Sequence, residues 1–333
     1  MISENEKQDR TNSTEIKEDE NMKTNTNEYT TFPRTFDTYK CCKPLLVGTL
    51  TALFTLIGQG ILAVISALWI GNGAVGFMQA LDKNGPFFFS GPGALFAIGG
   101  VALILPAFAL AVRIVHDRPF SSYSSSRGGW NWKIFFRSLI LAFIVFGCMN
   151  VVYMVAGGAF DMGITNRFTV IGFLICTLLI PVQAVAEEYV FRGLLMQSIG
   201  SWTRLPVLAM VLSSIVFAIF HSYNLMGILA VLSSGLMFAF VTWYTRGLEV
   251  SSAAHIVNNM TLFYGMGLCL NASQEGGIGS LLFTVAMNII YGTAVVLLDR
   301  KFGWFSEKSS PKGTSEAGNQ KEMLILNNNT GAA

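Results

Sequence analysis

The chain has 333 residues, of which 52% are hydrophobic and only 13% are charged, and its formal net charge is +2. Soluble globular domains carry about 25% charged residues, so this composition excludes an ordinary soluble domain. The sequence also contains no basic block and no motif that reads DNA or RNA, so we expect no nucleic-acid partner.

The charged residues are concentrated at the two ends of the chain. Of the 42 Asp, Glu, Lys and Arg residues, 16 lie within 1–44 and eight within 300–333, which leaves 18 for the 255 residues between them. Residues 1–44 show no apolar periodicity and predict a disordered polar N-terminal tail. We interpret 300–333 as a polar C-terminal tail, and 45–299 as a region whose natural solvent is a lipid bilayer.

Apolar runs long enough to cross a membrane recur along this region. A spanning helix needs about 20 apolar residues, and a chain in lipid must satisfy its backbone polar groups internally. The sequence therefore predicts an all-α, polytopic bundle of about eight transmembrane helices, at 45–70, 88–115, 134–157, 168–199, 205–225, 226–244, 251–270 and 278–298.

Lysine and arginine near the ends of the spans predict the orientation. One side of the predicted bundle carries nearly all of them, and the other carries only Lys83 and Arg167. Cytoplasmic loops are enriched in these residues, so we expect both termini in the cytoplasm. In a bacterial host the protein would be a multi-pass protein of the plasma membrane.

The predicted span 168–199 contains two adjacent acids and a base. We interpret it as one long helix, which Pro181 is able to kink. Charged residues inside a membrane span indicate a functional site by default. Glu188 and Arg192 are four residues apart, a spacing that predicts an ion pair on one helical face. Glu187 points about 100° away and is left free for chemistry.

Two histidines and an asparagine fall in other predicted spans. His221 lies near the end of 205–225, and His255 and Asn259 share a face of 251–270 because they are four residues apart. At about 1.5 Å per residue, Glu187 and His221 are expected at similar depths, roughly 20 and 25 Å from the cytoplasmic turn between their helices. By the same count His255 lies only roughly 6 Å into its helix.

These residue types match the needs of peptide hydrolysis. A glutamate with a histidine partner can deprotonate water, and a second histidine with an asparagine can donate hydrogen bonds to an oxyanion. We therefore predict no cofactor. A zinc ion held by Glu187, His221 and His255 is an alternative. A non-catalytic adaptor, or a transporter that uses Glu187 and His221 as a proton relay, is also compatible with the same residues.

Taken together, three motifs resemble those of the CPBP family. They are Glu187-Glu188-Tyr189-Val190-Phe191-Arg192, Phe217-x-x-x-His221 and His255-x-x-x-Asn259. The family comprises type II CAAX prenyl endopeptidases and the bacterial Abi proteins, which act in bacteriocin processing or self-immunity. The resemblance covers about residues 168–298.

The resemblance implies a glutamate-type intramembrane endopeptidase whose partner is a peptide or protein substrate at the membrane. Carried over to this sequence, Glu187 would activate water together with His221. His255 and Asn259 would form the oxyanion hole, and Glu188 paired with Arg192 would support the helix. It also divides the membrane region into N-terminal helices at 45–160 and a catalytic core at 161–299. A non-catalytic immunity protein is the alternative within the family.

Overall fold

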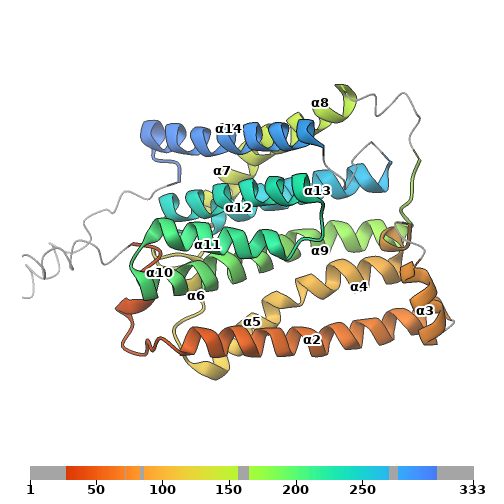
Figure 1. Ribbon diagram of the computed structural model, residues 1–333, viewed down its shortest axis with the longest axis horizontal. Helices are drawn as coiled ribbons and strands as arrows, with labels where there is room; N and C mark the ends of the chain where they lie inside the picture. Colours follow the sequence, from red (N-terminus) through yellow and green to blue (C-terminus); the bar gives the residue numbers. More distant parts are fainter. Residues whose placement is uncertain (1–27, 72, 83–85, 157–164, 270–276, 306–333) are drawn as a thin grey trace, which may run out of the picture.

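The computed structural model describes residues 28–71, 73–82, 86–156, 165–269 and 277–305. Within these ranges the chain is built of helices and connecting loops (Figure 1). In chain order the elements are η1 (Phe32–Thr35), α2 (Lys43–Ile70), α3 (Gly73–Asp82), η2 (Pro86–Phe89), α4 (Gly91–Ala102), α5 (Ile104–Val115), α6 (Ser121–Ser124), α7 (Trp132–Ala142), η3 (Phe143–Cys148), α8 (Met149–Ala156), α9 (Val170–Glu188), η4 (Tyr189–Met196), α10 (Gln197–Thr203), α11 (Pro206–Ile219), α12 (Leu225–Thr245), α13 (Glu249–Gly267) and α14 (Ile278–Phe302).

Six helical segments of the described chain are long and apolar enough to cross a bilayer. They are Lys43–Ile70, Gly91–Val115, Trp132–Ala156, Val170–Thr203, Leu225–Thr245 and Ile278–Phe302. The all-α, multi-pass membrane architecture expected from the sequence is therefore confirmed. The placement of both termini in the cytoplasm stays a prediction.

Each of the eight ranges expected as spans contains a helix, but two of these helices do not qualify as spans. α11 has 14 residues and is about 21 Å long, shorter than the roughly 30 Å hydrocarbon core. α13 has 19 residues, but polar side chains interrupt its apolar character. The count of eight is therefore not confirmed, and six is the number that length and composition support.

The helices lie side by side with their axes close to one direction (Figure 1). α2 lies at one edge beside α4 and α5, and α14 lies at the opposite edge near α7. Between these edges, α13 packs against α7, α9 and α12. The interior of the bundle is therefore formed by α9 and α13, the two helices that carry most of the polar residues identified in the sequence.

The long helix from Val170 to Thr203 does not end at its two acids. α9 continues without a break into η4, whose backbone has π-helical hydrogen bonding, and then into α10. The single helix expected from the sequence is present, but the change in register comes directly after Glu188, beyond the turn that contains Pro181. Isolated π-helical turns occur often at functional sites.

The described part of the N-terminal segment differs from the expected disordered tail. Tyr29 and Thr30 are fully buried, and the Tyr29 hydroxyl donates a 3.0 Å hydrogen bond to the carbonyl of Tyr123. Gly200 permits this close packing, because a Cβ atom there would meet the Cβ of Thr30 at 2.5 Å. Residues 28–42 thus pack against α10, while residues 1–27 and 306–333 lie outside the described ranges.

Tyr29 anchors this segment to the helix that carries the acids. Burial raises the pKa of its phenol above the usual range, so the hydroxyl stays protonated and available as a donor. We predict that Tyr29→Ala destabilises the protein by about 3–5 kcal/mol through the cavity it leaves. Tyr29→Phe, which loses only the donor, should cost about 1 kcal/mol.

Thermal unfolding of the purified protein in detergent measures both effects. Tyr153→Ala is the control, because Tyr153 is 43% exposed on α8 and its removal leaves no buried cavity. Equal melting temperatures for the Tyr29 and Tyr153 variants would contradict the anchoring role.

Candidate active site

Glu188 lies at the centre of a buried charged cluster. Its Oε1 accepts a 2.9 Å hydrogen bond from the Arg192 guanidinium, and the two side chains are fully buried. The same oxygen lies 2.9 Å from Nδ1 of His255. The structure thus contains the ion pair that the four-residue spacing predicts, and adds His255 from α13 as a third member.

Arg192 links this cluster to α12. A second guanidinium nitrogen donates to the carbonyl of Gly235 at 3.1 Å. The guanidinium carbon lies 4.5 Å from the ring centroid of Phe217 and 5.3 Å from that of Phe238. These are cation–π distances, so the charge is compensated by an acid, a carbonyl and two aromatic faces.

Glu187 faces a different set of partners, as its position on the helix predicts. Its Oε1 accepts a 2.6 Å hydrogen bond from Gln183, one turn earlier in α9. Its Oε2 lies 3.3 Å from Nε2 of His255 and makes no well-aligned hydrogen bond with any described residue. One carboxylate oxygen of Glu187 is therefore held in place, and the other is buried beside the His255 ring without a hydrogen-bond donor.

Gln183 also connects Glu187 to Asn259. The Asn259 amide donates to the Gln183 side-chain oxygen at 3.2 Å, so a hydrogen-bonded chain runs from α13 to the carboxylate. The sequence interpretation did not identify Gln183. The signal was present, because a glutamine four residues before Glu187 in an apolar span shares its helical face.

The shallow position counted for His255 does not separate it from the glutamates. His255 contacts both glutamates and is 3% exposed. The depth estimate assumed that every helix begins at the membrane surface. α13 instead begins inside the folded protein, where Glu249 is fully buried and pairs with Arg127 at 2.7 Å.

His221 lies in the turn after α11, two residues beyond the end of that helix at Ile219. It was expected within a helix that continued to 225. Its Nδ1 lies 2.9 Å from the carbonyl of Phe217. Because a carbonyl only accepts, Nδ1 carries the proton and Nε2 is left as an acceptor in the neutral ring. The Phe217 ring also packs against both histidines. Its centroid lies 4.8 Å from the ring centroid of His221 and 5.8 Å from that of His255.

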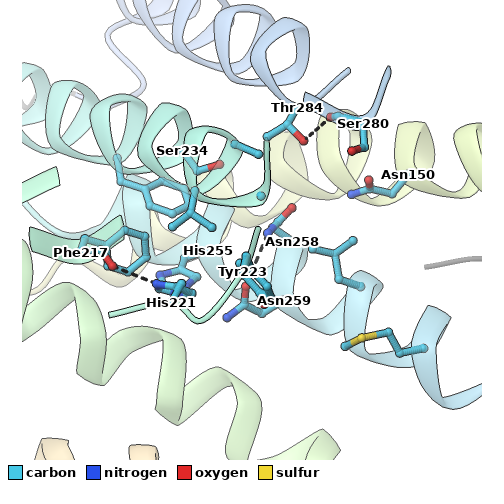
Figure 2. Close-up of a pocket in the computed structure, with 16 residues that line it drawn as sticks. Asn150, Phe217, His221, Tyr223, Ser234, His255, Asn258, Asn259, Ser280 and Thr284 are labelled. Atoms are coloured by element: carbon cyan, nitrogen blue, oxygen red, sulfur yellow. Dashed lines mark hydrogen bonds between the residues drawn. The ribbon is translucent and has the colours of Figure 1, made fainter. Parts of the chain in front are cut away.

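A cavity of about 220 Å³ adjoins these residues. Figure 2 shows the rings of His221 and His255 close together at one side of it, with Asn259 beside them. Glu187 is not part of the wall but lies directly behind His255. The cavity thus brings His221, from the turn after α11, together with His255 and Asn259 of α13, next to a carboxylate.

Comparison with known proteins agrees with this arrangement. Residues 167–261 match the family described as type II CAAX prenyl endopeptidase Rce1-like, a range that contains all three motifs. The chain carries an Rce1-like segment. It is also 28% identical over 229 residues to the uncharacterized protein YyaK of Bacillus subtilis (strain 168), a match that covers 62% of this chain and 74% of YyaK. No solved structure matches the chain.

The Rce1-like match supports a membrane peptidase and bears out the resemblance found in the motifs. It covers the helices that carry the charged cluster, and leaves the helices before residue 167 unmatched. The individual roles of Glu187, His221, His255 and Asn259 are untested by it.

The zinc alternative, with Glu187, His221 and His255 as ligands, stays a hypothesis. In the part of the chain that the structure describes, no three His, Cys, Asp or Glu side chains are arranged to hold a metal ion together. His255 has one ring nitrogen directed at Glu188 and the other at Glu187. Among the described residues, Glu187, His221 and His255 thus do not meet the geometry of a three-ligand metal cluster.

The ion pair makes a direct prediction about folding. Arg192→Ala should lower the stability of the protein by about 3–5 kcal/mol, because it leaves the Glu188 carboxylate buried without its cation. The double change Glu188→Gln with Arg192→Met removes both charges and should restore much of the folded yield. Detergent-solubilised yield and thermal unfolding measure both variants.

Arg113→Ala serves as the control, since Arg113 is exposed at the end of α5. An Arg192→Ala protein with the yield and melting temperature of the control would show that the pair contributes nothing to folding.

Proposed function

We propose that the protein is an intramembrane endopeptidase, CAAX-protease-like in its chemistry. Its substrates would be membrane-associated, lipidated or hydrophobic peptides. One observation carries the proposal: Glu187 is held by Gln183 on one oxygen, and its other oxygen has no hydrogen-bond donor and lies 3.3 Å from Nε2 of His255, which lines a cavity inside a membrane bundle. A carboxylate placed in this way is suited to act as a general base.

In the proposed reaction, a water molecule binds between Glu187 and His221. The water donates one proton to Glu187 while Nε2 of His221 accepts a hydrogen bond from it, and its oxygen forms a bond to the peptide carbonyl carbon. The tetrahedral intermediate collapses when the C–N bond breaks. Glu187 then returns the proton to the departing amine, so the carboxylate is regenerated.

His255 and Asn259 are the proposed donors to the oxyanion. His255 donates from Nδ1 to Glu188, so donation to the oxyanion uses Nε2, and the ring carries both protons in this step. Glu188 and Arg192 are positioning residues, because they hold the ring of His255 without facing the cavity. In a bacterial host, we place the enzyme in the plasma membrane with its termini in the cytoplasm.

Substitutions at the site test these roles. We expect Glu187→Gln, His221→Ala and His255→Ala each to abolish cleavage, and Asn259→Ala to lower the rate by ~10²–10³-fold as a lost oxyanion donor. Mass spectrometry of membrane-protein termini, from cells expressing the wild type or Glu187→Gln, identifies the cleavage products. Asn166→Ala, at an exposed position before α9, is the control and should match the wild type.

New termini that appear only with the active protein support the peptidase and reveal its cut sites. Identical termini in both samples, with a cellular phenotype that survives Glu187→Gln, would instead indicate a non-catalytic adaptor or a self-immunity protein. Gln keeps the shape of Glu, so a binding role tolerates the change. Proton-coupled flux that is lost with Glu187→Gln would indicate a transporter.

The proposed general-base role of Glu187 also predicts independence from a metal ion. Cleavage by the purified protein should persist after prolonged dialysis against a chelator, and added zinc should not raise its rate. Loss of cleavage on dialysis, reversed by zinc, would contradict the proposed general-base role of Glu187 and favour a metal-bound water.

A further inference from the structure

Asn150 is a polar residue in an unusual position. It lies in α8, within the membrane-spanning segment Trp132–Ala156, and is only 8% exposed. None of the described residues forms a hydrogen bond with its side chain. Asn150 lines the cavity, so its amide is free to bind a group that enters there.

The carboxamide of Asn150 faces the active-site cavity. Figure 2 shows it directed at the space between Asn258 of α13 and Ser280 and Thr284 of α14, on the side away from the two histidines. The Thr284 hydroxyl donates to the carbonyl of Ser280 at 2.9 Å, which leaves its oxygen as an acceptor. Three helices thus bring two carboxamides and hydroxyl groups to one end of the cavity.

The rest of the wall near this end is apolar. Val231, Leu262 and Met266 are among the apolar residues of the wall. A substrate segment in the cavity would meet apolar contacts and, apart from the two histidines and Asn259, hydrogen-bonding groups at the end near Asn150. The four polar residues at that place carry no formal charge, so a charged substrate group would gain no opposite charge there.

We propose that Asn150, Asn258 and Thr284 form a subsite for an uncharged amide of the substrate. A carboxamide both donates and accepts hydrogen bonds. It can therefore pair with the carboxamides of Asn150 and Asn258 as a donor and as an acceptor. The inference rests on the proposed function, because it assigns the cavity to the peptide that is cut. It adds a selection rule, which is that an otherwise apolar substrate carries an amide at a fixed distance from the cleaved bond.

Binding to an inactive protein tests the subsite without cleavage. The probe is a set of apolar peptides in detergent, each with Gln or Leu at one position, titrated against the full-length Glu187→Gln protein. At one position the Gln peptide should bind about tenfold more tightly than the Leu peptide, as expected for one well-formed hydrogen bond in a buried site. The ratio of the two affinities should fall to about one in Asn150→Leu and should be smaller in Thr284→Val than in the protein without this change.

A second arm distinguishes the source of the amide. If the bound group belongs to the main chain, Gln and Leu peptides bind equally, and N-methylation of one backbone amide weakens binding in the protein with Asn150 but not in Asn150→Leu. Gln59→Leu is the matched control, since Gln59 is a half-buried amide on α2 that already donates to the carbonyl of Phe96. It should lower the melting temperature and keep the binding preference, whereas Asn150→Leu should keep the melting temperature and lose the preference.

The subsite is overturned if neither a side-chain nor a main-chain amide is preferred, or if the preference survives Asn150→Leu in a folded protein. Failure of the proposed function gives a different result. If the amide preference depends on Asn150 but the wild type cuts none of the peptides, the subsite stands and the peptidase proposal fails. If the wild type cuts them with no regard to the amide, the peptidase stands and the subsite fails.

Discussion

The buried ion pair between Glu188 and Arg192 is the interaction on which the rest of the site depends. Two charges removed from water cost several kcal/mol each, and their attraction compensates only when the remaining polar groups are also satisfied. Here Glu188 also contacts His255, and Arg192 also binds the Gly235 carbonyl and two aromatic faces. The pair therefore draws α12 and α13 onto the π-helical turn that follows α9.

This arrangement explains why two adjacent glutamates have different environments. Glu188 is fully buried, and its Oε1 contacts both Arg192 and His255. Glu187 is 13% exposed, and its Oε1 accepts a hydrogen bond from Gln183 while its Oε2 lies beside His255. His255 contacts both, so the position of the structural pair also determines the position of the ring beside Glu187. In this way Glu188, which takes no part in the proposed chemistry, positions the His255 ring beside the proposed base Glu187.

Features that depend on local spacing were predictable from the sequence. The bilayer requires long apolar helices, so their ranges could be read from hydropathy, and a separation of four residues was enough to predict the Glu188–Arg192 pair. Features that depend on packing between distant segments were not predictable. α13 begins inside the protein, so a count of residues from the membrane surface did not show that His255 would contact both glutamates, and nothing in residues 1–44 indicated that Tyr29 would be buried.

The cavity is also a feature that depends on packing between distant segments and could not be predicted from the sequence. Its wall combines residues from α8, α11, α12, α13 and α14, and no motif links Asn150 or Thr284 to the histidines. An isolated asparagine in an apolar run is a weak signal, because such residues often join helices by hydrogen bonds. Only the folded arrangement distinguishes Asn150, which faces an open space, from polar residues that already have partners.

Hydrolysis by purified protein in oxygen-18 water tests the central claim most directly. The wild-type protein and Glu187→Gln, each reconstituted in lipid vesicles, would be incubated with the same apolar peptides, and the products analysed by mass spectrometry. The account predicts that the wild type releases products whose new carboxyl group carries oxygen-18, and that Glu187→Gln releases none. Equal release of labelled product by both proteins would show that Glu187 does not activate the water.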